Sequence, residues 1–227
     1  MKLTFWLLDV NYEVKDGTPA LWLWGIDAFA ERVLIVDRSF LAYFYAVMEE
    51  HADPVKIVES VENEQYESII KLEVVGQKFF GKTVKAVKVY CRNPDEIPKC
   101  SRDLRAFEGI KEFFEDDIRY SMRYLIDNNV VPCGWHEVEV AEERSDRAIK
   151  VEKTYAAKTP PRLLKKPTVP PLRILGFSTI CYSRQGSPKP DRNPVVMISV
   201  RTNSGEEQLL ESSGERKNCK TLSDFFG

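Results

Sequence analysis

Few side chains in this sequence have the types and the spacing that metal or nucleophile chemistry requires. The 227 residues include two histidines, His51 and His136, which is little material for a histidine-based metal site or a catalytic triad. The cysteines are odd in number and no two form a Cys-x-x-Cys pair, so neither a disulfide framework nor a zinc ribbon is indicated. We therefore predict no metal or other cofactor, and we expect free thiols at Cys91, Cys100, Cys133, Cys181 and Cys219.

Basic residues gather in one part of the chain, although its net charge is −2. Between residues 144 and 173, nine Lys and Arg stand against only Asp146 and Glu152. A stretch of this kind can lie along a phosphate backbone and release its counterions. The alternative is a solvated linker whose charges serve solubility, and on charge alone this is the simpler interpretation.

The elements that must position any site are mostly strands. Apolar, β-rich runs over residues 3–14, 19–27 and 31–40 predict a three-stranded meander. From Tyr43 to Asp116 the pattern predicts the order strand, helix, strand, strand, helix, strand, which is that of a ferredoxin-like unit. RNA-recognition modules share this order, but residues 85–92 lack their glycine and aromatic pattern. A further short helix is expected at residues 118–129.

The composition and the residue pattern of the sequence change after residue 134. Residues 137–158 are polar and alternating and could pair as edge strands, and residues 158–171 contain five prolines, which suit an extended connector rather than a sheet interior. Three β-runs follow at 172–183, 193–203 and 206–213, with a short tail at 220–227. We therefore expect an α+β fold that ends in a three-stranded antiparallel sheet.

Composition places the chain among ordinary globular proteins. Hydrophobic residues make up 43% and charged residues 30% of the sequence. The apolar runs are too short to cross a bilayer, and Asp9 interrupts the N-terminus too early for a signal-peptide core. We expect a cytoplasmic protein with no membrane partner.

Five phrases of the sequence resemble the beginning of archaeal family B DNA polymerases: "LLDVNYEVKDGTP", "DRSFLAYFYAVM", "GKTVKAVKVYCRNPDEIP", "EDDIRYSMRYLIDNNVVP" and "LRILGFSTICYSRQGSPKPDRNPVVMISV". The resemblance implies an N-terminal uracil-recognition-like domain at 1–134 and a basic, Pro-rich connector at 135–171. Residues 172–227 would be the start of a 3′–5′ exonuclease domain with an RNase H-like sheet. The palm that carries the polymerase carboxylates is missing, so a truncated homologue is expected.

The resemblance also implies that the exonuclease metal site has been lost. Family members carry Phe-Asp-Ile-Glu where this chain has Phe177, Ser178, Thr179 and Ile180. Two-metal hydrolysis needs the Asp and Glu because hard cations take anionic oxygen ligands. Ser178 and Ile180 are poor substitutes, so we predict that this chain is not an enzyme and has no nuclease activity.

By contrast, the resemblance implies that most of a pocket for deaminated bases is retained. In the family, the residues matching Tyr43 and Ile118 bind the base through their backbones, and Ala42 and Tyr120 replace a proline and a phenylalanine. Contacts to the DNA backbone would come from Arg123, Lys165 and Lys166. Taken singly, each of these residues could instead be ordinary core or surface. The expected pocket consists of Tyr12, Ala42, Tyr43, Pro94, Ile97, Ile118 and Tyr120.

Two functions follow as hypotheses. The favoured one is a non-catalytic protein that binds single-stranded DNA and recognises uracil, with hypoxanthine as a further candidate base, and that recruits repair enzymes. The alternative is a non-catalytic N-terminal subunit of a split family B polymerase, partnered by a polymerase catalytic chain. A relic or fragment with no specific partner is the third interpretation.

Overall fold

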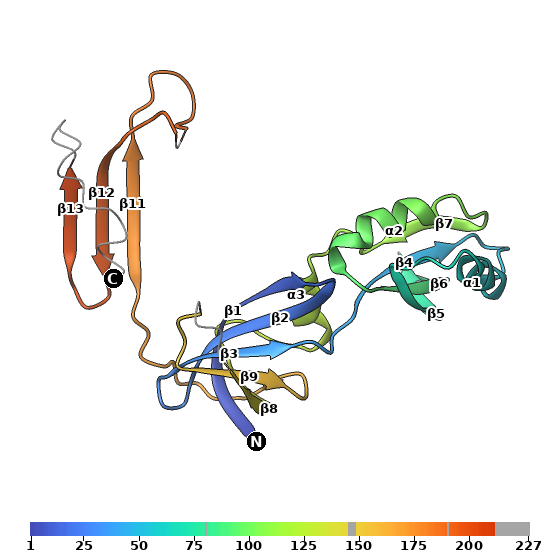
Figure 1. Cartoon of the computed structure of the whole chain (residues 1–227), viewed down its shortest axis with the longest axis horizontal. Coiled ribbons are helices and arrows are strands. Elements are labelled where there is room, and N and C mark those ends of the chain that lie inside the picture. The colour runs from blue at the N-terminus through green and yellow to red at the C-terminus, as the bar shows by residue number, and fades with distance from the viewer. Residues whose placement is uncertain (80, 145–148, 190, 212–227) are drawn as a thin grey trace. The chain divides into compact units, whose positions relative to one another are not determined.

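A computed structural model describes residues 1–79, 81–144, 149–189 and 191–211. The chain divides into two compact units, Met1–Pro170 and Pro171–Gly227 (Figure 1). Asp146 and Arg147 of the basic stretch, Cys219, the end of the last predicted strand and the predicted tail at 220–227 lie outside the described residues.

The first sheet of unit 1 closes on itself. Its strand order is β1-β2-β3-β9-β8-β10, and β1 also pairs with β8. Asp16 and Gly17 both have positive φ, 51° and 74°, as the two-residue turn between β1 and β2 requires. The strands are β1 (Lys2–Lys15), β2 (Thr18–Asp27), β3 (Arg32–Asp37), β8 (Trp135–Glu143), β9 (Lys153–Ala157) and β10 (Arg162–Leu163).

Residues 135–163 differ from the predicted connector, because they supply three strands of this sheet. β9 lies in the sheet interior, parallel to β3 and antiparallel to β8. The physical reason is the alternation of the sequence, which turns Val138, Val140 and Tyr155 into the buried core. Prolines enter only around β10, where no central ladder is interrupted.

The second sheet of unit 1 has the order β5-β6-β4-β7, and all its pairings are antiparallel. The predicted order of strands and helices between residues 42 and 114 is observed, although the second helix is a 3₁₀ turn, η1, followed by α2, which ends at Leu104. Asp53 caps α1 by accepting a hydrogen bond from Val55 N–H at 3.1 Å. The elements are β4 (Ala42–Met48), α1 (Pro54–Asn63), β5 (Ile69–Phe79), β6 (Lys82–Cys91), η1 (Pro94–Glu96), α2 (Ile97–Leu104) and β7 (Ile110–Phe114).

One face of the second sheet carries both helices. Ile57 and Val61 of α1 and Leu104 of α2 are buried in the same cluster as Phe44 and Val89 of the sheet. Because side chains alternate along a strand, Tyr43 on β4 and Tyr90 on β6 project from the opposite face. This opposite face is called the outer face below.

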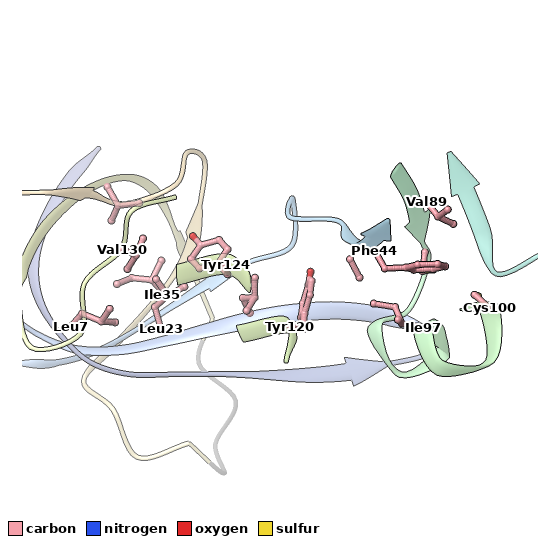
Figure 2. Packing of buried hydrophobic residues seen from close by; sticks show 14 of the residues in the cluster. Leu7, Leu23, Ile35, Phe44, Val89, Ile97, Cys100, Tyr120, Tyr124 and Val130 are labelled. Carbon is pink, nitrogen blue, oxygen red and sulfur yellow. The ribbon is translucent and has the colours of Figure 1, made fainter. Parts of the chain in front are cut away.

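Helix α3 (Tyr120–Asp127) belongs to the core that the two sheets share. Figure 2 shows Tyr120 between core residues of the first sheet, such as Leu23, and core residues on its other side, such as Phe44 of the second sheet and Ile97 of α2. The Tyr120 hydroxyl donates to the Phe40 carbonyl on the segment joining β3 to β4. Tyr124, one turn later, donates to Asp37 Oδ2 at 2.8 Å.

Unit 2 contains one antiparallel sheet of order β11-β12-β13 (Figure 1). Its strands are β11 (Leu175–Cys181), β12 (Val195–Thr202) and β13 (Glu207–Glu211). Among its described apolar residues Val200 is buried, whereas Phe177, Ile180 and Leu209 are more than half exposed. The fold is thus mixed α+β, strand-rich and poor in helix; the finer ferredoxin-like and RNase H-like assignments stay predictions.

His136 is a buried titratable residue that makes the stability of the fold depend on pH. The ring is fully buried, its Nδ1 lies 2.9 Å from the Gly134 carbonyl oxygen, and Val131 N–H donates to its Nε2 at 3.2 Å. A neutral ring protonated at Nδ1 satisfies both contacts. Burial lowers the pKa of His136 below its ordinary value of 6.5.

We therefore expect stability to fall as the pH drops below about 6.5, since the unfolded chain then takes up a proton that folded His136 does not. His136→Gln should flatten this dependence between pH 7 and pH 5, a window that lies above the titration of ordinary carboxylates. Urea unfolding at several pH values measures it. His51→Gln is the control, and an unchanged pH slope in the His136 variant would contradict the expectation.

Candidate nucleic-acid-binding site

Tyr43 stands at the centre of a charged and aromatic cluster on the outer face. Its hydroxyl donates to Asp127 Oδ2 at 2.5 Å and accepts from Arg123 Nη1 at 3.3 Å. Lys88 Nζ lies 3.6 Å from the centroid of the Tyr43 ring, and Arg123 Cζ lies 4.6 Å from the same point. Both cations are therefore held by the negative faces of this aromatic ring.

Burial shifts the titration of the cluster. It raises the pKa of Tyr43, with a further contribution from the bond to Asp127, so the phenol stays protonated near neutral pH. Burial and the hydrogen bond to Glu73 raise the pKa of Tyr90 to about 12. Desolvation lowers the pKa of Lys88. The cluster therefore presents phenolic donors beside Lys88, whose ammonium is only partly solvated.

Arg123 is anchored more firmly than an ordinary helix arginine. It lies in α3, is 6% exposed, and makes an ion pair of 2.6 Å with Glu115 and a longer contact of 4.0 Å with Asp127. Its Nη2 is buried without a hydrogen-bond partner among the described residues. The guanidinium thus lies inside the protein, behind Tyr43.

A cleft of about 320 Å³ opens beside this cluster, which is within the usual range for small-molecule sites. Asp37 is held in its wall by bonds from Ser39 N–H at 2.8 Å and from the Ser39 hydroxyl at 2.7 Å. Of the seven predicted pocket residues, this cleft contains Tyr43. Its lining is Asp37, Ser39, Phe40, Leu41, Tyr43, Lys88, Tyr90, Tyr124, Asp127 and Pro160.

Most of the other predicted pocket residues gather on the opposite side of β4. The Tyr12 ring meets the Tyr120 ring edge-on, with centroids 5.4 Å apart. Tyr12 also donates to Asp95 Oδ1 at 2.8 Å, which ties β1 to η1. Ala42, Ile97 and Tyr120 are each at most 7% exposed and belong to the hydrophobic core.

Side-chain alternation explains this separation. Ala42 and Tyr43 are consecutive on β4, so their side chains project from opposite faces. Pro94 is buried in η1, and Ile118 is half-buried in the segment between β7 and α3. The seven side chains consequently do not line one cavity together, and their role as a base pocket stays a prediction.

The sheet edge beside Tyr43 is incomplete. β7 pairs with Tyr45 to Met48, and within the described chain its ladder does not reach Ala42–Phe44. Glu115, with a φ of 63°, follows β7 and turns the chain away toward Ile118. Within the described residues the start of β4, Ala42–Phe44, is therefore not paired with β7, and residues 115–119 continue the chain from the end of β7.

Several contributors to this region were missed at the level of sequence. Lys88, Tyr90 and Asp127 surround Tyr43 and were not among the predicted site residues. The alternation of Lys88 and Tyr90 in "KVY" was an available signal, because it places both side chains on one face of a strand. Asp127 gave no such signal, since only the docking of α3 brings it to Tyr43.

Some residues of the basic stretch contact other groups of the protein. Lys165 and Lys166 are both exposed, and Lys166 Nζ lies 3.9 Å from the ring centroid of Trp135. Arg162 pairs with Glu137 at 3.3 Å, and Lys153 pairs with Glu31. These pairings lower the charge that residues 149–173 can offer to a phosphate backbone.

Ser178 and Ile180 lie on β11 of unit 2, both exposed. Neither side chain fits the carboxylate role that a divalent cation requires. Within residues 1–79, 81–144, 149–189 and 191–211, no group of three or more His, Cys, Asp or Glu side chains could hold a metal ion. We therefore derive no metal-dependent step from these residues.

Residues 111–225, just over half of the chain, match the model of the DNA polymerase family B exonuclease domain. The chain belongs to this family. The match begins in β7, so it takes in α3, β8 and β9 of unit 1 as well as unit 2. The described helices include none long and apolar enough to span a bilayer.

Archaeal family B polymerases resemble almost the whole chain. DNA polymerase 3 of Saccharolobus shibatae is 31% identical over 226 residues, and DNA polymerase 2 of Aeropyrum pernix is 29% identical over 229. The solved family B polymerase of Pyrobaculum calidifontis is 34% identical, with a TM-score of 0.79 over 98% of this chain. The chain spans less than a third of the length of these proteins, between 28% and 29%.

These comparisons contradict the prediction that the chain is not an enzyme. Its relatives are DNA polymerases, which are enzymes, and more than half of the chain matches an exonuclease domain. The prediction rested on the missing palm and, for the exonuclease, on Ser178 and Ile180. Active sites of this kind are assembled from side chains on several segments, so two positions cannot establish that the chain is inactive.

The Tyr43 hydroxyl should contribute measurably to stability. We expect Tyr43→Phe to lower the free energy of unfolding by about 1–3 kcal/mol, because Asp127 loses a buried donor and Arg123 loses an acceptor. Urea denaturation measures this loss. Tyr66→Phe is the matched control, since that hydroxyl has no hydrogen-bond partner among the described residues; an equal loss in both variants would contradict the assignment.

Proposed function

We propose that this protein binds single-stranded DNA and captures a deaminated base, uracil above all, at the unpaired start of β4, beside residues 115–119. The observation that carries the proposal is the incomplete edge of β4 beside Tyr43, where β7 stops short of Ala42–Phe44. The similarity to archaeal DNA polymerases supports DNA as the partner.

The chemistry of uracil suits an unpaired strand edge. Uracil presents O2 and O4 as acceptors on either side of the N3–H donor, and backbone N–H and C=O groups complement this edge. Cytosine carries an amino group and a bare N3 in two of these places, so it would leave buried groups unpaired. Sites that discriminate by hydrogen bonding reject the wrong partner by factors as large as ~10⁴.

Thymine must be rejected by shape, because it differs from uracil by one methyl group. Tyr12, Tyr120 and the neighbouring core support the inner side of β4 with little freedom to move. Overfilling such a packed region costs about 1–3 kcal/mol. Capture requires the base to leave its stack, which is least costly in a single strand.

Fluorescence anisotropy tests this on matched single strands that carry one uracil or one thymine. We expect the uracil strand to bind about 10- to 200-fold more tightly, the range that one methyl group provides. Ile118→Arg should remove the preference by placing a long, charged side chain beside this strand edge. Ile126→Arg, at an exposed position of α3, is the control and should retain it. Equal affinities in the unaltered protein would refute the proposal.

A second candidate function is assembly with a polymerase catalytic chain. It is favoured by unit 2, where Phe177, Ile180 and Leu209 expose apolar surface. Co-expression with the remaining domains of an archaeal relative tests it: the two chains should co-elute, and Phe177→Ser should weaken this more than Thr179→Ser. Separate elution of the unaltered chains would exclude this candidate.

A further inference from the structure

The β5–β6 hairpin is strongly basic in an otherwise acidic chain. Residues 69–92 contain six Lys and Arg against one acid, Glu73, whereas the remaining 203 residues contain 27 basic and 34 acidic side chains. None of these six residues was among the predicted DNA contacts. The hairpin thus concentrates positive charge that the net charge of −2 conceals.

Three lysines in the distal half of the hairpin lack counter-ions. Lys78, Lys82 and Lys85 are exposed, and none has an ion-pair partner in the described ranges. Nearer the core, by contrast, Lys71 pairs with Glu73 at 2.5 Å and Lys88 lies over Tyr43. The free charge therefore lies toward the turn of the hairpin.

The strand register brings two of these lysines close together. Lys85 stands opposite Gly76 and Lys78 opposite Thr83, so Lys78 and Lys85 are diagonal neighbours about 7–8 Å apart, on the face of the hairpin that lies opposite to the outer face. Gly76 places no side chain between them. Like charges at this spacing repel each other, and an anion that contacts both would remove this cost.

The third lysine lies in line with the proposed base site. Lys82, Lys88 and Tyr90 alternate along β6 and so share the outer face with Tyr43, which pairs with Tyr90. From Tyr90 to Lys82 the strand advances about 27 Å. Phe79 stands opposite Lys82 and its ring lies 4.3 Å from that of Phe114, which adds aromatic surface at this end.

This combination fits a single nucleic-acid strand. Phosphates are contacted by lysines on flexible stems, which position a strand without reading its sequence. Grooves for single strands combine such charges with aromatic rings. The distance along β6 is long enough for a strand to continue past the cleft beside Tyr43.

We propose that the distal half of the β5–β6 hairpin binds the phosphodiester backbone of a single DNA strand, which runs from the Tyr43 region along the outer face past Lys82 and then passes around the edge strand β5 to Lys78 and Lys85 on the other face. The inference rests on the DNA-binding part of the proposed function but not on base selectivity. Its contacts are electrostatic, so they strengthen binding of uracil and thymine strands alike.

The test uses the full chain and a thymine-only single strand, followed by anisotropy over a series of salt concentrations. The variant Lys78→Ala/Lys82→Ala/Lys85→Ala should bind roughly tenfold more weakly. The plot of log K against log[salt] should also become less steep by about 2, because each of the three lost phosphate contacts contributes about 0.7 to the slope. Lys15→Ala/Lys56→Ala/Lys99→Ala removes the same charge at exposed positions elsewhere in unit 1 and should leave both quantities nearly unchanged.

Circular dichroism and urea unfolding establish that both triple variants are folded. Equal weakening in the two variants, an unchanged slope in the hairpin variant, or hairpin-dependent binding of duplex as tight as that of the single strand would overturn the inference. Loss of uracil preference with a retained hairpin effect would instead refute base selectivity and leave the phosphate surface supported. No measurable binding of any strand would refute both proposals.

Discussion

The burial of Tyr120 at the start of α3 is the interaction on which the rest of unit 1 depends. Its ring contacts Tyr12 of the first sheet and Phe40 of the segment that joins the sheets, and its hydroxyl donates to the Phe40 carbonyl. Tyr124 adds a second attachment of the same kind through Asp37. Together with the shared hydrophobic core and the hydrogen bond from Tyr12 to Asp95, these contacts fix the position of β4 relative to β1.

A consequence is that β4 has two chemically different sides. Ala42 and Phe44 face the core, where they are held by apolar packing, while Tyr43 faces Lys88, Asp127 and the cleft. The rigidity of the inner side limits how far the outer side can adapt. A strand supported in this manner is suited to present main-chain groups at a fixed position, which is the property that base discrimination demands.

The same outer face continues along β6 into a region of different character. Near Tyr43 the charges are compensated and partly buried, whereas toward the hairpin turn Lys82 is exposed and has no ion-pair partner among the described residues. A partly buried surface such as that near Tyr43 favours selectivity, because desolvated groups discriminate between partners. An exposed, positively charged surface favours affinity for a polyanion, and this affinity weakens as the salt concentration rises.

Local pattern determined much of the architecture. Alternating apolar residues, the Asp16–Gly17 turn and the Asp53–Pro54 cap were sufficient to predict β1 to β3 and the order of elements from β4 to β7, because such signals act over a few residues. Only the tertiary structure decided that β9 would join the sheet interior and that β8 would pair with β1, since these pairings join residues more than a hundred positions apart. The site divides in the same way. The sequence identified Tyr12, Tyr43 and Tyr120 as candidate site residues. Alternation along β4 and the docking of α3 then decided that Tyr43 lies with Asp127 and Lys88, whereas Ala42 and Tyr120 lie in the core. Residue type is a local property, whereas the face on which a side chain lies depends on what the rest of the chain packs against it.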